Sequence, residues 1–324
     1  MQNNKTSSYT AASGGFPIKI FKNLDLISAI LNHKVIKPIH IQLNPTNKCN
    51  LSCSFCSCSE RDRSLQLSKE RLNKIFTSFS ILGCRSVTIT GGGEPLMLKD
   101  LPWLVNESIK LGIAVGLVTN GYLLKKEHNK TLESTTWVRI SVSDESDWDK
   151  LSHSIKPLIG VSTDWSFSYV VSENPNMRTL SDAIKFANEH NFTHVRVVND
   201  ILKPVTNLTG LRMAIVESGV NDKLVVWQDR QSYTTGAKRC LISLMKPVVG
   251  ADGFIYPCCG TQYAQSPPDR DYGKSMRMGV IDNIGEMWSK QAHYDGSNCM
   301  KCYYSNYNDS LSGLIDEIDH HLFV

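Results

Sequence analysis

Between residues 38 and 205, short apolar segments alternate with longer amphipathic ones, and this alternation restricts the fold more than any other feature. The segments with strand character are 40–45, 85–91, 113–121, 137–143, 165–172 and 194–200, and those with helical character are 68–83, 101–112, 126–135, 147–158 and 179–191. Such alternation is typical of βαβ units that form a parallel sheet. The units are fewer than the eight of a complete TIM barrel. The expected fold class is therefore α/β, with an open partial barrel or a doubly wound sheet.

The composition is that of a globular protein of about two domains. Of the 324 residues 41% are hydrophobic, and 35 basic against 31 acidic residues give a formal charge of +4. So small a charge neither identifies nor excludes a nucleic-acid partner. No apolar run has the length of a membrane span, and the N-terminal residues lack the apolar core of a signal peptide. We therefore expect a cytoplasmic protein without a membrane segment.

The rhythm of strands and helices fades after residue 205, and the expected organisation changes there. The expected divisions are an N-terminal extension (1–37), the α/β domain (38–205), a linker (206–229), and a small metal-organised domain with a C-terminal tail (230–324). Within the extension, residues 17–36 predict a short amphipathic helix with Leu24, Ile27, Ile30 and Leu31 on one side.

The ten cysteines occur in groups. Four lie within residues 49–58, Cys84 stands alone, and five lie between residues 240 and 302. Without a secretion signal, grouped cysteines indicate metal ligands or reactive thiols before disulfides. Cys84, between a helical and a strand segment, is expected to be a small buried apolar residue.

The first group has the spacing C-x3-C-x2-C, at Cys49, Cys53 and Cys56, directly after the first strand segment. Three thiolates on one loop can bind three irons of a [4Fe–4S] cube and leave the fourth iron open for chemistry. A zinc site with Cys58 as a fourth ligand is an alternative, although structural zinc ligands usually come as two separated pairs. A second alternative is an electron carrier in which Cys58 caps the fourth iron.

The segment NPTNKCNLSCSFCSC resembles the cluster loop of the radical S-adenosylmethionine (SAM) enzymes, with Phe55 in the aromatic position of their signature. The second strand runs into Gly91, Gly92, Gly93 and Glu94, similar to the segment that engages the amino group of SAM in that family. The resemblance implies further contacts with SAM or substrate from Thr119, Asn120, Ser141 and Ser143 at later strand ends. It covers roughly residues 38–205 and implies a partial (β/α)6 TIM-like barrel instead of a doubly wound sheet.

The second group spreads over three separated segments. Its members are Cys240, Cys258 in a Gly253-x4-Cys pattern, and the pair Cys299 and Cys302. By chemistry alone, four thiolates suit a second [4Fe–4S] cluster or structural zinc. The pattern is similar to the C-terminal SPASM domain of radical SAM enzymes, in the shorter one-cluster form called twitch. The resemblance implies one auxiliary cluster held by these four, with the adjacent Cys259 as an alternative to Cys258.

The resemblance also implies a mechanism. One electron from a flavodoxin- or ferredoxin-like partner lets the first cluster cleave SAM to a 5′-deoxyadenosyl radical, which abstracts a hydrogen atom from a substrate C–H. An auxiliary cluster that accepts the second electron gives oxidation. A cysteine that returns a hydrogen atom gives epimerisation, and Cys58 or Cys259 is the candidate for that catalytic role.

The substrate is the least determined part. Fewer than 40 residues precede the first strand segment, too few for the leader-binding domain that peptide-modifying relatives often carry. We therefore expect a small molecule or nucleoside, with maturation of a ribosomally made peptide as the alternative. Arg61, Arg63, Arg230 and Lys238 are candidates to meet a phosphate or carboxylate, or are solvated surface residues.

Overall fold

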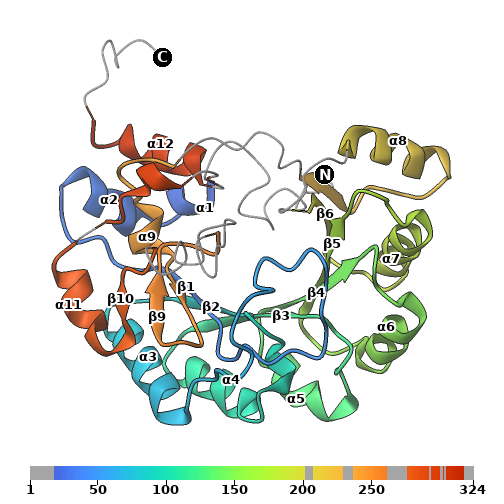
Figure 1. Cartoon of the computed structure of the whole chain (residues 1–324), viewed down its shortest axis with the longest axis horizontal. Helices are drawn as coiled ribbons and strands as arrows, with labels where there is room; N and C mark the ends of the chain where they lie inside the picture. Colours follow the sequence, from blue (N-terminus) through green and yellow to red (C-terminus); the bar gives the residue numbers. More distant parts are fainter. Residues whose placement is uncertain are drawn as a thin grey trace.

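A computed structural model describes residues 18–200, 207–228, 236–260, 276–291, 293–299, 302 and 304–316. One curved sheet runs through it, with helices wrapped around the outer face (Figure 1). The strand order is β10-β9-β8-β1-β2-β3-β4-β5-β6-β7. The first seven strands are β1 (His40–Leu43), β2 (Ser86–Ile89), β3 (Ala114–Thr119), β4 (Trp137–Ser143), β5 (Asp164–Val171), β6 (His194–Asn199) and β7 (Val225–Gln228).

The seven strands are parallel and follow one another in chain order. A doubly wound sheet would reverse its strand order at a switch point, whereas a barrel adds each strand to the same edge. Among the described residues β7 pairs with β6 alone, and the sheet does not close. The predicted α/β partial barrel is therefore confirmed.

The helices between these strands lie on the convex side of the sheet (Figure 1). They are α3 (Lys69–Ile81), α4 (Leu101–Lys110), α5 (Asn129–Glu133), α6 (Trp148–Ile155), α7 (Met177–Glu189) and α8 (Leu208–Glu217). Helix α3 shows how the sequence sets a boundary. The Ser68 hydroxyl accepts a hydrogen bond from the Arg71 backbone N–H, which caps the helix, and the buried face contains Leu72, Ile75 and Phe79.

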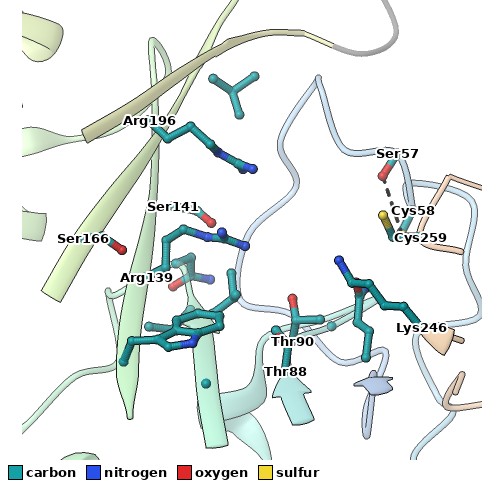
Figure 2. A pocket seen from close by; sticks show the side chains of 18 of the residues that line it. Ser57, Cys58, Thr88, Thr90, Arg139, Ser141, Ser166, Arg196, Lys246 and Cys259 are labelled. Atoms are coloured by element: carbon teal, nitrogen blue, oxygen red, sulfur yellow. Dashed lines mark hydrogen bonds between the residues drawn. The ribbon is translucent and has the colours of Figure 1, made fainter. Parts of the chain in front are cut away.

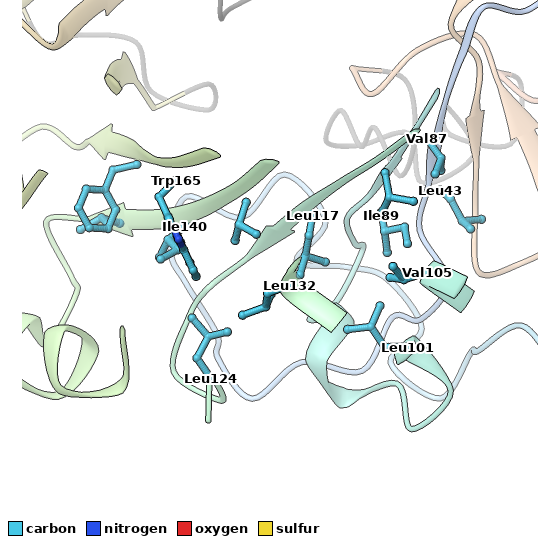
Figure 3. Packing of buried hydrophobic residues seen from close by; sticks show 14 of the residues in the cluster. Leu43, Val87, Ile89, Leu101, Val105, Leu117, Leu124, Leu132, Ile140 and Trp165 are labelled. Atoms are coloured by element: carbon cyan, nitrogen blue, oxygen red, sulfur yellow. The ribbon is translucent and has the colours of Figure 1, made fainter. Parts of the chain in front are cut away.

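The main hydrophobic core fills the layer between the sheet and these helices. Figure 3 shows Leu43, Ile89 and Leu117 of the strands packed against Leu101 and Val105 of α4. On the concave side, the same strands carry many polar residues, as the alternation Trp-Val-Arg-Ile-Ser-Val-Ser of β4 illustrates. One face of the sheet is therefore a packed core, and the other borders a cavity.

Within the expected linker (206–229), the described residues 207–228 contain α8 and β7. Strand β7 pairs in parallel with β6, so a seventh unit continues the barrel. Much of α8 is exposed, Met213 and Val216 included, so its sequence lacks the clear apolar stripe that would have identified it.

The C-terminal region joins the same sheet. Strand β8 (Val248–Val249) pairs in parallel with β1, and β9 (Phe254–Tyr256) and β10 (Gly279–Val280) continue from it in antiparallel order. The remaining helices of this region are α9 (Ile242–Met245), α11 (Ile284–Ser289) and α12 (Ser305–Ser312). The small domain is therefore built onto the barrel edge.

The N-terminal extension contains α1 (Ile18–Phe21) and α2 (Leu24–Leu31), which lie beside α9 and α12 (Figure 1). Leu26 and Ile30 of α2 belong to a second hydrophobic cluster shared with α9 and α12. The predicted face was wrong at two positions, because Leu24 and Leu31 are exposed. Among the described residues no helix has the length and apolar character needed to cross a membrane.

Candidate functional site

The cysteine loop follows β1 and begins at the carboxyl end of the parallel strands, where barrel enzymes carry their sites. Cys49, Cys53 and Cys56 are half-buried and line one large cavity of about 1240 Å³. Arg61, which is 7% exposed, stabilises the loop from inside. Its guanidinium donates to the Asn47 carbonyl at 2.9 Å and approaches the Cys56 sulfur at 3.5 Å.

The donor set of this loop fits an iron–sulfur cluster. Burial raises the pKa of Cys53 to about 11, and the nearby Cys56, Glu145 and Cys49 add to the shift. Negative charge on these thiols is therefore mutually unfavourable, and a bound cationic cluster would relieve it. Among the described residues no three His, Cys, Asp or Glu side chains are placed to bind a single metal ion. In a cluster, by contrast, each thiolate binds a different iron.

The glycine segment after β2 packs directly on the cysteine loop. The backbone N–H of Gly93 donates to the Thr46 carbonyl at 3.0 Å, and that of Glu94 donates to the Lys48 carbonyl at 2.7 Å. A Cβ atom at Gly93 would lie 2.0 Å from the Lys48 carbonyl oxygen, so only glycine allows this approach. Gly91 and Gly92 line the same cavity.

Glu94 is 2% exposed and connects this segment to β3. Its carboxylate accepts hydrogen bonds from the Thr119 hydroxyl and the Asn120 backbone N–H, both at 2.7 Å, and from the Leu96 backbone N–H at 3.0 Å. Burial raises the pKa of Glu94, and these hydrogen bonds oppose the shift. Much of the accepting capacity of Glu94 is thus used within the chain, and its contact with SAM stays a prediction.

The other predicted SAM contacts also border the large cavity. Phe55, Thr119, Asn120, Ser141 and Ser143 all line it. The Asn120 side chain donates to the Asn50 side-chain oxygen at 2.8 Å, which links the end of β3 to the cysteine loop. Residues from four separate strand ends and loops thus surround one space.

The second cysteine group lines a small cavity of about 20 Å³, to which Cys240, Cys258, Cys299 and Cys302 all contribute. Burial raises the pKa of Cys240 to about 11, and Cys302 and Cys299 add to the shift. Gly253 forms the turn before β9 with φ of +80°, which explains the glycine of the predicted pattern. The four predicted ligands are thus brought together, and Cys302 also lines the large cavity.

The three remaining cysteines lie in two different environments. Cys84 is 6% exposed and belongs to the main core, as predicted. Cys58 and Cys259 both line the large cavity. Figure 2 labels both in the same part of the cavity, although they come from segments far apart in the sequence.

The basic residues around the cavity are mostly not those that the sequence singled out. Arg61 is bound inside the cysteine loop, and Arg230 lies outside the described residues. Arg139 of β4, Arg196 of β6 and Lys246 after α9 line the cavity instead. The sequence signal for Arg139 was the period-two alternation of polar and apolar residues in β4. A strand covered on both faces by a core is apolar throughout, so this alternation indicates that one face of β4 borders a polar space.

Comparison with known proteins identifies one domain of the chain. A profile described as the Radical SAM superfamily matches residues 43–196, which include the cysteine loop and the Gly91–Glu94 segment. The fold matches SuiB of Streptococcus suis bound to its precursor peptide SuiA, with a TM-score of 0.58 and 18% identity over 83% of this chain and 70% of SuiB. It also matches anSMEcpe bound to AdoMet and a peptide, with a TM-score of 0.57 and 18% identity over 89% of this chain and 86% of that one.

Residues 43–196 therefore form a radical SAM domain. The cofactors of such an enzyme are SAM and iron–sulfur clusters.

Two curated relatives are named after the same reaction. The probable GTP 3′,8-cyclase of Sulfolobus acidocaldarius is 26% identical over 239 residues, or 64% of this chain and 72% of that protein. The GTP 3′,8-cyclase of Staphylococcus aureus is 34% identical over 136 residues, or 39% of each chain. The second match thus spans about two fifths of that relative.

Proposed function

We propose that this radical SAM enzyme abstracts a hydrogen atom from a small molecule or nucleoside and leads to its oxidation or epimerisation. One observation carries the proposal: a single cavity of about 1240 Å³ is lined by the cysteine loop, the Gly91–Glu94 segment, the strand ends and Cys302 of the second cysteine group. A cavity of this size holds SAM together with a second small molecule. The name GTP 3′,8-cyclase, given to two relatives, supports a nucleoside-type substrate.

In this proposal Cys49, Cys53 and Cys56 hold the catalytic cluster. When bound, the cluster and SAM supply a 5′-deoxyadenosyl radical and methionine, using one electron from a flavodoxin- or ferredoxin-like donor. The half-buried cysteine loop opens onto the cavity, so a cluster held by Cys49, Cys53 and Cys56 would be accessible to a ligand bound there. This arrangement favours catalysis over the role of an electron carrier, in which a fourth protein ligand caps the cluster.

The chain's own residues orient SAM in this proposal. The backbone of Gly91, Gly92 and Gly93 provides a close surface without side chains. Glu94 holds Asn120 through the Asn120 backbone N–H and leaves the side chain of Asn120 at the cavity wall. Ser141 and Ser143, on the inner face of β4, offer hydroxyl groups to the ribose or to the substrate.

We further propose that Cys240, Cys258, Cys299 and Cys302 hold an auxiliary [4Fe–4S] cluster. Their convergence on one small cavity supports this ligand set, and the Asn308 side-chain amide lies 3.7 Å from the Cys240 sulfur. The functional division would then be the radical SAM barrel from residue 38, extended through β7, and a twitch-like region from residue 230. When bound, such a cluster would supply an acceptor for the electron that the substrate radical must lose, together with a proton, in an oxidation.

Cys58 and Cys259 support the epimerisation outcome, because both thiols line the cavity (Figure 2). A thiol that gives its hydrogen atom to the substrate radical becomes a thiyl radical, which one electron from the donor and one proton restore. Replacing either cysteine with Ala distinguishes the two outcomes. Loss of epimerised product with continued 5′-deoxyadenosine formation supports hydrogen return, whereas an unchanged oxidised product supports electron transfer to the auxiliary cluster.

Maturation of a peptide is the second candidate. The fold similarity to SuiB bound to a precursor peptide and to anSMEcpe bound to a peptide favours it. Deuterated nucleotides and peptides, incubated anaerobically with the enzyme, SAM and dithionite, discriminate between the two. Deuterium appears in 5′-deoxyadenosine only from the true class of substrate.

The cysteine loop provides the direct test of radical SAM chemistry. We expect the triple variant Cys49→Ala, Cys53→Ala, Cys56→Ala to lose reductive SAM cleavage, measured as 5′-deoxyadenosine by chromatography. Cys84→Ala, which removes a buried thiol outside the cavity, is the matched control and keeps the activity. Undiminished 5′-deoxyadenosine formation by the triple variant would contradict the proposal.

Because the cluster chemistry is oxygen-sensitive and all ten thiols are free, we expect the enzyme to work in the cytoplasm.

A further inference from the structure

The interior of the barrel differs from that of a packed TIM barrel, which is filled by branched apolar side chains. Here the inward positions of β4, β5 and β6 include Arg139, Ser141, Ser166, His194 and Arg196, all of which line the cavity. The strand register places Arg139 level with Ser166 and His194, and Arg196 level with Ser141, one layer nearer the carboxyl ends. Two guanidinium groups therefore lie on neighbouring layers of one wall.

Each of these arginines is held in place by its neighbours. The Arg196 guanidinium donates to the Ser168 hydroxyl at 2.7 and 3.2 Å. The Arg139 guanidinium stands over the Trp137 ring at 5.4 Å from its centre. That ring in turn occupies the space beside Gly116, where a Cβ atom would lie 2.1 Å from it. Pre-positioned guanidinium groups lose little conformational entropy when they bind a ligand.

A third cation approaches from the opposite side. Lys246 follows α9, and its ammonium donates to the Tyr304 hydroxyl at 3.1 Å. Figure 2 shows Arg139 and Arg196 extending from one side of the cavity and Lys246 from the other. Burial lowers the pKa of Lys246, and the positive charges of Arg139 and Arg196 act in the same direction, whereas the thiols of Cys259 and Cys258 oppose it. The three groups therefore share one electrostatic environment.

The described carboxylates of the cavity wall do not share the layers of Arg139 and Arg196. Glu94 is engaged by three donors beside the cysteine loop, and Glu145 accepts hydrogen bonds from Ser54 of that loop. Asp164 is exposed at the start of β5, level with Trp137. The middle of the cavity is thus positive, and gathering like charges there is unfavourable until an anion binds.

We propose that Arg139, Arg196 and Lys246 form the binding site for an anionic group of the substrate, a phosphate or a carboxylate. This inference rests on the proposed function, because it assigns the substrate class of the same cavity. Guanidinium forks match the oxygens of both anions, and the hydroxyl of Ser141 offers an additional donor beside them.

The position of the site along the barrel sets where the reacting carbon lies. Arg139 precedes Ser143 by four residues on β4, which corresponds to about 13 Å along the strand. An anion held by Arg139 is therefore deep in the barrel, while the cysteine loop lies at the carboxyl ends. A small molecule with its charged end at Arg139 presents its other end toward SAM, as the geometry of hydrogen abstraction requires.

Anion binding by the reconstituted holoenzyme with SAM tests the inference. We use inorganic phosphate and succinate as separate probes in anaerobic calorimetric titrations, so that the two sources of the anion are distinguished. For the probe that binds, we expect Arg139→Gln, Arg196→Gln and Lys246→Gln each to weaken affinity about tenfold. Arg196→Lys should recover part of the affinity, because it restores the charge without the fork. Arg178→Gln is the control, since that side chain on α7 is 84% exposed.

Several results would overturn the inference. These are the absence of saturable binding of both anions by the wild-type enzyme, or equal affinity of the wild-type enzyme and all three glutamine variants. Iron content and circular dichroism spectra identify a variant that fails to fold, and Lys246→Gln, on the other wall, then provides an independent test. A wild-type protein that binds the anion without cleaving SAM would refute the proposed function and leave the anion site standing.

Discussion

Glu94 shows how a single buried carboxylate connects two parts of the site. It receives three hydrogen bonds from Leu96, Thr119 and Asn120 and is almost fully removed from water. Three donors would lose their acceptor if the side chain were shortened, and buried donors without partners are costly. The residue therefore stabilises the junction between the glycine segment and β3, whatever it contributes to SAM binding.

We expect Glu94→Ala to lower the free energy of unfolding by about 2–4 kcal/mol, because it leaves these donors unsatisfied. Urea denaturation followed by circular dichroism measures the change. Glu173→Ala, at an exposed position, is the control and should have an effect near zero. A Glu94→Ala variant as stable as this control would show that the hydrogen bonds contribute nothing to folding.

His194 is a buried titratable group of the barrel wall. Burial lowers its pKa to about 4, and the positive charges of Arg139, Arg196 and Lys19 act in the same direction. The folded protein therefore keeps His194 neutral at pH values where the unfolded chain, with a pKa near 6.5, binds a proton. Because the unfolded state binds more protons between these two values, this group makes stability fall as the pH decreases from about 6.5 to about 4.

When the pH is lowered from 7 to 5, we expect the free energy of unfolding to fall by about 2 kcal/mol less in His194→Gln than in the wild type. The reason is that glutamine cannot be protonated. Urea unfolding at the two pH values measures this difference. His153→Gln, on the exposed side of α6, should behave like the wild type. Identical pH dependence in all three proteins would contradict the assignment.

Among the elements, the cysteine loop and the glycine segment act as one unit. Backbone hydrogen bonds from Gly93 and Glu94 to Thr46 and Lys48 join them, and only a glycine fits at position 93. A displaced glycine segment would therefore displace the loop that carries Cys49, Cys53 and Cys56.

We expect Gly93→Ala to reduce the iron bound at the first cluster at least severalfold, because the new methyl group would meet the Lys48 carbonyl oxygen. Iron analysis and electron paramagnetic resonance of the anaerobic protein measure the loss. Gly285→Ala is the matched control, because a Cβ atom there has open space. Normal cluster content in Gly93→Ala would show that the two segments move independently.

The predictable elements were those whose sequence pattern is local. The helix expected over 68–83 is observed as Lys69–Ile81, and the six predicted strands are present. Strand β8 was not predictable, because its two residues gain strand geometry only by pairing with β1. For the site, the spacing of the cysteines carried the information. The convergence of Arg139 and Lys246 depends on contacts between distant segments, which spacing does not encode.

At the scale of the whole molecule, the C-terminal region and the barrel share one sheet and adjoining cores. Trp288 of α11 is 1% exposed, packs edge-on against Phe79 of α3 at 5.3 Å, and donates its indole N–H to the Leu244 carbonyl at 3.1 Å. Gln291 binds the Ile36 backbone through both its amide oxygen and its nitrogen. The N-terminal extension, the barrel and the C-terminal region are therefore expected to unfold together.

We expect Trp288→Ala to destabilise the protein by about 3–5 kcal/mol, the usual effect of removing a large buried side chain. Urea unfolding should remain a single transition by both circular dichroism and loss of cluster absorbance. Ile81→Ala, at a position that is 79% exposed, is the control. Two separate transitions would show that the C-terminal region folds independently of the barrel.

The pairing of β1 with β8 also has a consequence during synthesis. The backbone N–H groups of Gln42 and Asn44 donate to the carbonyls of Pro247 and Val249 at 3.0 and 2.9 Å. Until those late residues leave the ribosome, the first strand of the nascent chain has an open edge, and open edges recruit strands from other chains. A chain stopped before residue 240 would therefore be prone to aggregate, even though it contains the whole cysteine loop.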